Sequence, residues 1–191
     1  LVSPAAPTAE LADLAWLLLA SCGRSFNDQT AGWQVGQRLT PSGGNLASQT
    51  LYVVNHGIDG LERGLYHFNP QRGSLEVRQL ADLLPAIDRL IVGALPADSE
   101  VLAVVIETAA LGRVESKYAY KAYRYSLYDA GSLLQSLASV GATLGWEVLV
   151  TADFDDEALR EVLQLHSVTE TPLLISYLVR VASPIAAEVL L

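Results

Sequence analysis

The most regular pattern of apolar positions in the chain runs from Leu127 to Leu144, where leucine, alanine and glycine recur at steps of three or four residues. This spacing places those side chains on one face of a helix. Between Tyr128 and Gly145 the only charged side chain is Asp129, so the opposite face is neutral as well. Because a helix without charge on either face is usually buried in a core or against a second subunit, we expect a long, buried central helix here.

Shorter apolar runs predict the strands of a sheet. β-branched and aromatic residues dominate the segments LYVVN (51–55) and LYHFNP (65–70), and the second of these turns through QRG into SLEVRQL as a hairpin. Continuous apolar runs predict three further strands, in the segments VLAVVIET, WEVLVTA and TPLLISYLVRVAS.

Three other segments have helical patterns. We predict a helix over 10–20, one or two short helices over 81–99, and an amphipathic helix in FDDEALREVLQL, whose acidic first turn suits the helix dipole. Strands and helices interleave without a regular βαβ alternation. This arrangement predicts an α+β fold in which helices pack on a mixed sheet.

The length of 191 residues predicts one domain. Residues 1–9 are rich in proline and alanine and read as a tail or linker, the domain spans 10–183, and 184–191 forms a C-terminal extension that a partner subunit could receive. The first residue is not methionine, which indicates a processed chain or a piece of a longer protein.

Composition limits the classes of partner. Hydrophobic residues make up 51% of the chain and charged residues 17%, which is ample for a large core and suggests that part of the surface is buried in an oligomer. The net charge of −9 argues against nucleic acid as a partner, because phosphate binding needs an excess of Lys and Arg. A cationic cluster at 117–124 is local and suits a small anionic or polar ligand.

Several kinds of site and location are disfavoured. The single cysteine, Cys22, excludes an intrachain disulfide and fits a reducing, cytoplasmic location. The three histidines have no metal-ligand spacing, so no metal site is expected. The apolar run LADLAWLLLA is too short to span a bilayer and lacks the basic region of a signal peptide, so no membrane association is expected.

The first candidate for chemistry is the segment 38–45, RLTPSGGN. Gly43 and Gly44 would let a ligand approach the backbone closely, Pro41 stiffens the approach, and Ser42 and Asn45 offer hydrogen bonds. A helix that began near Asn45 would favour an anion at its N-terminus. The alternative is a plain turn followed by a helix cap. No P-loop or GxGxxG pattern occurs in the chain.

The second candidate is Lys117-Tyr118, which opens a run of cations and aromatic residues. A phenol beside a cation, and a lysine with a shifted pKa, are plausible acid–base groups for a reaction that moves a proton together with a hydride. The alternative is a solvated helix start whose long side chains lie over apolar surface.

Three segments, in this order, carry a resemblance to a known family: RLTPSGGNLASQTLYVV, GLERGLYHFNPQRGSLE and SKYAYKAYRYSLYDAGSLLQSLASVGATLGW. They resemble the flavin-dependent oxidoreductases of the nitroreductase superfamily, most closely the SagB-type dehydrogenases, which include the azoline oxidases of thiazole- and oxazole-forming pathways. With the closing segments FDDEALREVLQL and ETPLL, the similarity extends over about 160 residues.

The resemblance implies a nitroreductase-like α+β fold, with a mixed, mostly antiparallel sheet flanked by helices and a long buried central helix. It also implies FMN bound at a homodimer interface. The matching positions that would lie at or near FMN are Arg38, Pro41, Ser42, Gly43, Gly44, Asn45, Gly131 and Gln135. Lys117 and Tyr118 match the pair that azoline oxidases use to abstract a proton.

The sequence departs from the pattern of the family at several places, among them the segment Asn45-Leu46-Ala47-Ser48 and the last strand, where Tyr177 or Leu178 replaces a glycine. Ala119 replaces the glycine that usually follows the tyrosine, and Ser132 stands where histidine is common. The Arg-Arg-Ser start that helps to hold the FMN phosphate in simpler nitroreductases is absent, and its nearest substitute is Arg24-Ser25.

The leading prediction is therefore an FMN-dependent oxidoreductase that dehydrogenates a heterocycle, of the azoline-to-azole type, on a peptide or carrier-bound intermediate. One alternative is a general NAD(P)H-dependent nitro- or quinone reductase. A second alternative is a flavin-free dimeric scaffold, half of a tandem protein, that docks a biosynthetic partner.

Overall fold

The computed structural model describes residues 8–25, 37–93, 100–165 and 169–180. Of the terminal segments predicted above, residues 1–7 and the whole of 184–191 lie outside the described residues.

A sheet of six strands forms the centre of the protein, in the order β5-β4-β3-β6-β8-β7. The strands are β3 (Gln49–Asn55), β4 (Gly64–Asn69), β5 (Ser74–Gln79), β6 (Glu100–Ala110), β7 (Trp146–Thr151) and β8 (Glu170–Arg180). Each described pairing between them is antiparallel. The predicted strands and the hairpin of β4 with β5 are thereby confirmed, because runs of β-branched and aromatic residues carry this signal locally.

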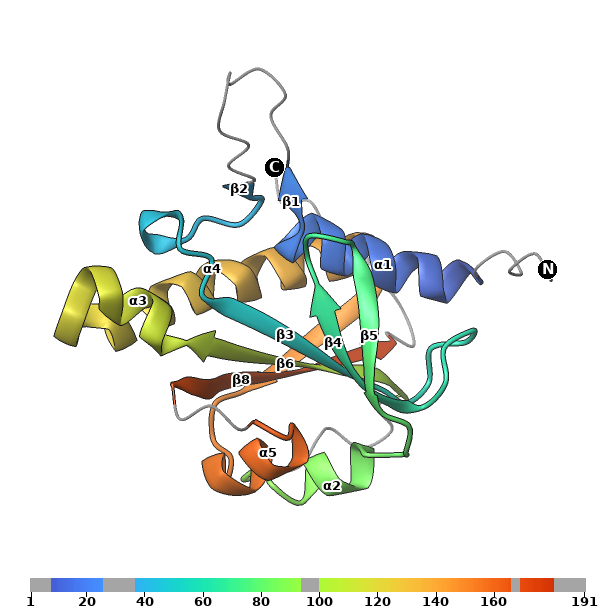
Figure 1. Ribbon diagram of the computed structural model, residues 1–191. Coiled ribbons are helices and arrows are strands. Elements are labelled where there is room, and N and C mark those ends of the chain that lie inside the picture. The colour runs from blue at the N-terminus through green and yellow to red at the C-terminus, as the bar shows by residue number, and fades with distance from the viewer. Residues whose placement is uncertain (1–7, 26–36, 94–99, 166–168, 181–191) are drawn as a thin grey trace, which may run out of the picture.

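Helices cover both faces of the sheet (Figure 1). On one face lie α1 (Ala9–Cys22) and α4 (Ala122–Thr143), and on the other lie α2 (Leu84–Asp88) and α5 (Asp156–Val162). Alternate residues of each strand point to opposite faces, so that Val53 packs with α1 and α4 whereas Val54 packs with α2 and α5.

The predicted long helix is α4, which contains 22 residues. Its inner face is buried against α1 and the sheet through Ala130, Leu133, Leu137 and Gly141. From Tyr128 onwards its outer face is neutral but open to solvent in the single chain, where Tyr128 is 63% exposed. The helix is therefore buried on one side, and the other side is free to meet a second subunit.

Several short elements contain or adjoin the two candidate segments, 38–45 and Lys117-Tyr118. A two-stranded ribbon of β1 (Arg24–Ser25) and β2 (Gln37–Arg38) follows α1, and the one-turn 3-10 helix η1 (Gly43–Asn45) precedes β3. At the far end of β6 the chain forms α3 (Leu111–Tyr118) and the short 3-10 helix η2 (Ala119–Lys121) before it enters α4.

The break between α3 and α4 falls at Ala119, whose backbone has φ 47° and ψ −128°. Glycine adopts this conformation readily, whereas a side chain makes it costly. The position at which the related family has glycine therefore carries a strained alanine here. The turn ends α3 directly after Lys117 and Tyr118 and so fixes where these two side chains emerge.

We expect Ala119→Gly to stabilise the protein. Relief of about 1–3 kcal/mol of backbone strain exceeds the 0.5–1 kcal/mol that glycine loses through greater freedom of the unfolded chain, for a net gain of about 1 kcal/mol. A chain of this size should then melt about 2–4 °C higher by calorimetry. Ala138→Gly, in the regular part of α4, is the matched control and should lower the melting temperature. A fall in both variants would show that Ala119 is not strained.

Candidate functional site

The segment 42–47 forms a tight loop between β2 and β3. Three of its residues have left-handed backbone conformations, with φ values of 63° at Gly44, 57° at Asn45 and 50° at Ala47. The Ser42 hydroxyl closes the loop by accepting a hydrogen bond of 2.9 Å from the Ala47 N–H. The predicted helix start is thus a single 3-10 turn inside a strained loop.

Two helices hold this loop from different sides. From α4, the Asp129 carboxylate accepts hydrogen bonds from the Gly43 N–H, at 2.8 and 3.0 Å, and from the Ser42 hydroxyl, at 2.9 Å. From α3, Arg113 Nη1 donates to the carbonyl oxygen of Ala47 at 2.7 Å. These bonds also occupy the donors of Ser42 and Gly43 that we expected to be available to a cofactor.

The structure brings the second candidate segment to the same loop. A methyl group placed on Gly44 would lie 2.6 Å from Lys117 Nζ and 2.7 Å from the Tyr118 hydroxyl oxygen, so both side chains reach the backbone of the loop. Lys117 Nζ also lies 5.5 Å from the centre of the Tyr118 ring. Lys117 is exposed and Tyr118 is half-buried, so solvent or a ligand can reach the pair.

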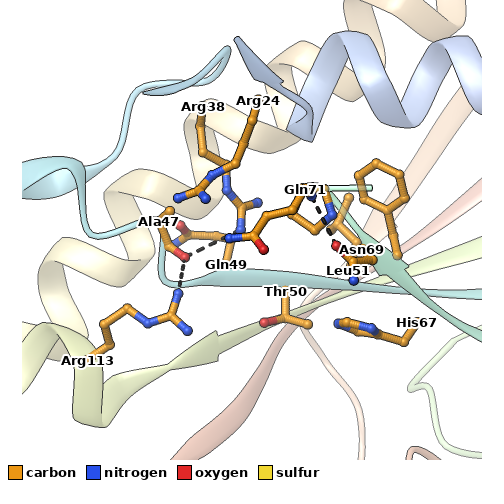
Figure 2. Close-up of a pocket in the computed structure, with 12 residues that line it drawn as sticks. Arg24, Arg38, Ala47, Gln49, Thr50, Leu51, His67, Asn69, Gln71 and Arg113 are labelled. Carbon is orange, nitrogen blue, oxygen red and sulfur yellow. Dashed lines mark hydrogen bonds between the residues drawn. The ribbon is translucent and has the colours of Figure 1, made fainter. Parts of the chain in front are cut away.

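A cavity of about 200 Å³ opens on the other side of the loop (Figure 2). It lies in a fork of the sheet. The pairing of β3 with β4 stops at Tyr52–His67, whereas β3 continues to Gln49 beside β6 and β4 continues to Asn69 beside β5. The cavity lies between the strands where they diverge.

Three arginines from three elements line this cavity. Arg24 and Arg38 are cross-strand neighbours in the β1–β2 ribbon, and Arg113 comes from α3 (Figure 2). No carboxylate lines the cavity among the described residues, and none of the three arginines forms an ion pair there. The Nε of Arg38 is buried without a described hydrogen-bond partner. A pocket lined by three arginines is suited to an anionic ligand.

Burial disfavours the charged forms of two acidic groups near Arg38, the Glu107 carboxyl and the Cys22 thiol. Glu107 on β6 is 2% exposed, and its Oε1 has no partner among the described residues. Burial above all, and then the charge of Asp129, raise the pKa of Glu107 well above 4.5, while Arg38 opposes the shift. Burial likewise raises the pKa of the Cys22 thiol, which contacts Arg38, to about 11. The Cys22 thiol is therefore neutral at neutral pH, and burial favours the protonated form of Glu107.

The predicted cofactor residues fall into two groups. Arg38 lines the cavity, and Pro41, Ser42, Gly43, Gly44 and Asn45 form the adjoining loop. Gly131 and Gln135 lie on the exposed outer face of α4, where Gln135 donates a hydrogen bond to Ser139 at 3.0 Å. A single chain does not bring this second group to the cavity.

Sequence reasoning missed Arg113 and Glu107 as members of the site. Asp129 stands out in the sequence as the only charged residue between Tyr128 and Gly145, but this pattern does not indicate which groups it binds. Within the described residues, no group of three or more His, Cys, Asp or Glu side chains could hold a metal ion, and no helix is long and apolar enough to cross a membrane.

Residues 4–179 match the sequence pattern of the Nitroreductase family. The chain belongs to the nitroreductase family. A Methanocaldococcus jannaschii protein, provisionally named a nitroreductase, is 27% identical over 146 residues, which are 73% of this chain and 69% of the relative.

Several solved structures share the fold. A provisionally named nitroreductase from Anabaena variabilis superposes with a TM-score of 0.79 at 24% identity over 91% of this chain, although this chain spans only 36% of that protein. A chain of the Escherichia coli microcin synthetase McbBCD complex, solved with truncated pro-MccB17 bound, gives a TM-score of 0.70 at 20% identity, covering 89% of this chain and 63% of that one. An oxidoreductase described as containing FMN gives 0.56 at 12% identity, over 93% and 70% of the two chains.

The family assignment confirms two of the predictions made from sequence. The nitroreductase-like fold is confirmed, and so is membership of an oxidoreductase family. Membership does not distinguish the SagB-type dehydrogenases from the general nitroreductases.

The pKa of Glu107 predicts how stability depends on pH. Its folded pKa is raised, so the folded chain keeps a proton that the unfolded chain loses above about pH 4.5. Stability therefore falls as the pH rises from that value towards the folded pKa, by about 1.4 kcal/mol per pH unit. Glu107→Gln cannot ionise and escapes this loss.

Urea unfolding from about pH 5 to 8 should show Glu107→Gln gaining on the wild type as the pH rises. Glu62→Gln, which neutralises an exposed glutamate, controls for the change in net charge. A constant difference between Glu107→Gln and the wild type across this range would refute the raised pKa.

Proposed function

We propose that this protein is an FMN-dependent oxidoreductase that dehydrogenates an azoline heterocycle, with the hydride passing to the flavin and the proton to Lys117 and Tyr118. The observation that carries the proposal is the meeting of Lys117 Nζ and the Tyr118 hydroxyl at Gly44, in the loop that borders the three-arginine cavity. An acid–base pair beside a cofactor site is what this reaction requires.

The residues present fit the phosphate of FMN. Arg24, Arg38 and Arg113 supply positive charge, and none of the described residues that line the cavity is a carboxylate. Amide side chains of Gln49, Asn69 and Gln71 line the same cavity and could bind the polar ribityl chain. When bound, FMN supplies the hydride acceptor.

A second subunit would complete the site. The cavity of about 200 Å³ is smaller than the 300–1,000 Å³ typical of sites for whole ligands. The outer face of α4 carries Tyr128, Gly131 and Gln135 and is exposed in the single chain. A homodimer that buried this face would bring two of the expected cofactor residues to an interface.

The contribution of the chain to catalysis is proton handling. Removal of hydrogen from an azoline takes a proton from one atom while a hydride leaves another, so a base must stand within hydrogen-bond reach of the substrate. In its phenolate form, Tyr118 takes that proton and becomes the neutral phenol, and Lys117, in the last turn of α3, places a positive charge beside the phenolate. The exposure of this pair also allows a peptide-borne substrate to approach.

A general NAD(P)H-dependent nitro- or quinone reductase is the second candidate, because the family and several structural neighbours carry the nitroreductase name. The microcin synthetase neighbour is part of a biosynthetic complex, which supports the first candidate and a biosynthetic partner protein. Anaerobic stopped-flow reduction distinguishes the two: rapid flavin reduction by NADH or NADPH would favour the second candidate.

FMN binding tests the cofactor half of the proposal. We expect the purified protein to bind FMN and quench its fluorescence, and Arg38→Gln to weaken binding about 10–100-fold, because a hydrogen bond to a charged group contributes about 1.5–3 kcal/mol. Arg89→Gln, at the end of α2 on the other face of the sheet, should bind as the wild type does. A wild-type protein that takes up no FMN would instead support the flavin-free scaffold.

Substitution of Lys117 or Tyr118 tests the proposed role of this pair in proton transfer. Lys117→Ala and Tyr118→Phe should retain FMN but oxidise a thiazoline-containing peptide about 10²–10⁴-fold more slowly, the range typical for loss of a general acid–base group. Turnover is followed by the absorbance of the thiazole product. Loss of FMN in these variants would instead assign the pair to cofactor binding.

A further inference from the structure

Asp129 is a carboxylate in an unusual position. It lies in the middle of α4, is 8% exposed, and forms no ion pair among the described residues. A buried carboxylate is costly unless donors satisfy it. All the hydrogen bonds that the structure shows for Asp129 come from Ser42 and Gly43, so the burial of this group depends on the position of the loop.

The hydrogen bonds from Ser42 and Gly43 to Asp129 also limit where Gly44, the next residue in the loop, can lie. Gly44 follows Gly43 directly, and its α-carbon faces Lys117 Nζ and the Tyr118 hydroxyl so closely that a methyl group there would overlap both. A shift of the loop towards α3 would therefore displace the pair, and a shift away would leave it unsupported. The loop therefore limits where the side chains of Lys117 and Tyr118 can lie.

A second set of contacts limits the movement that remains. Arg113 lies one helical turn before Lys117 on α3 and donates to the Ala47 carbonyl at the end of the loop. The Ser42 hydroxyl, which donates to Asp129, also accepts from the Ala47 N–H. Without Asp129 the beginning of the loop loses its anchor while the end stays attached to α3.

We propose that Asp129 is a positioning residue for the Lys117–Tyr118 pair, acting through Ser42, Gly43 and Gly44 and not by contact with substrate. The proposal rests on the proposed function, in which that pair handles the proton. It assigns a role to the lone charge of α4 and explains why a buried carboxylate stands in an otherwise neutral stretch of helix.

Asp129→Asn is the decisive variant, because asparagine keeps the shape of the side chain but replaces one acceptor oxygen by a donor. We expect kcat for the thiazoline peptide to fall roughly 10–100-fold, since a misplacement of about 1 Å can cost 10²-fold. KM should change little. Hydrogen exchange of the peptide covering 42–47 should accelerate even in FMN-free protein, because the Gly43 N–H loses its charged acceptor.

Asp88→Asn is the matched control. Asp88 also accepts a hydroxyl hydrogen bond, from Tyr177 at 3.0 Å, but lies in α2 on the other face of the sheet. Asp88→Asn should leave both kcat and the hydrogen exchange of residues 42–47 unchanged. Ser42→Ala is the second variant, should Asp129→Asn fail to fold: it removes one bond to Asp129 and should produce the same changes to a smaller extent.

A double-mutant cycle separates positioning from general structural support. If Asp129 acts through the pair, Asp129→Asn should lower kcat much less in a Tyr118→Phe background than in the wild type. Full additivity, or a normal kcat in Asp129→Asn with accelerated exchange, overturns the positioning role. Normal activity in both Lys117→Ala and Tyr118→Phe refutes the proposed function itself, and the role of Asp129 with it.

Discussion

A carboxylate enclosed in a packed interface must be matched by hydrogen-bond donors, and the donors that satisfy Asp129 belong to a loop more than eighty positions earlier in the chain. This one interaction ties α4 to the segment that precedes the sheet. The left-handed conformations within the loop, its attachment to α3 and its contact with Lys117 and Tyr118 all depend on where Asp129 holds it. The neutral sequence around Asp129 leaves the carboxylate no other charged partner within its stretch of helix.

The distribution of charge around Arg38 follows the same logic. The chain carries a net charge of −9, yet the cavity beside the loop is lined by three arginines and no described carboxylate. Burial favours the protonated form of Glu107, and Asp129 accepts its hydrogen bonds from the loop and forms no ion pair with an arginine among the described residues. The three arginines therefore have no ion-pair partner within the described part of the cavity lining, which favours an anion that enters.

The sequence was informative wherever the signal is local. Periodicity located α4, and runs such as VLAVVIET located the strands, because burial of a helix face or a central strand is written into neighbouring residues. Residue type also selected the segment 38–45 and the pair Lys117-Tyr118, which the fold brings together at Gly44. The family resemblance was confirmed at the level of the nitroreductase family.

Features that depend on the meeting of distant segments could not be derived in this way. The fork that forms the cavity exists because the β3–β4 ladder stops at Tyr52–His67, and no local pattern sets that limit. In the sequence, Glu107 is a residue near the end of an apolar strand, and only the fold places it close to Arg38 and Asp129. The positions of Gly131 and Gln135 relative to a cofactor depend on a second chain and remain predictions.

The distance along the sequence between Gly43 and Asp129 has a consequence for folding. The hydrogen bond between them joins residues 86 positions apart, and closing such a long loop is entropically costly until the intervening strands have paired. The hairpin of β4 and β5 needs no such closure, because its strands are neighbours in the sequence. The loop, in contrast, has its hydrogen bonds to Asp129 only when α4 lies against it, so the site requires contacts that the sheet alone does not supply.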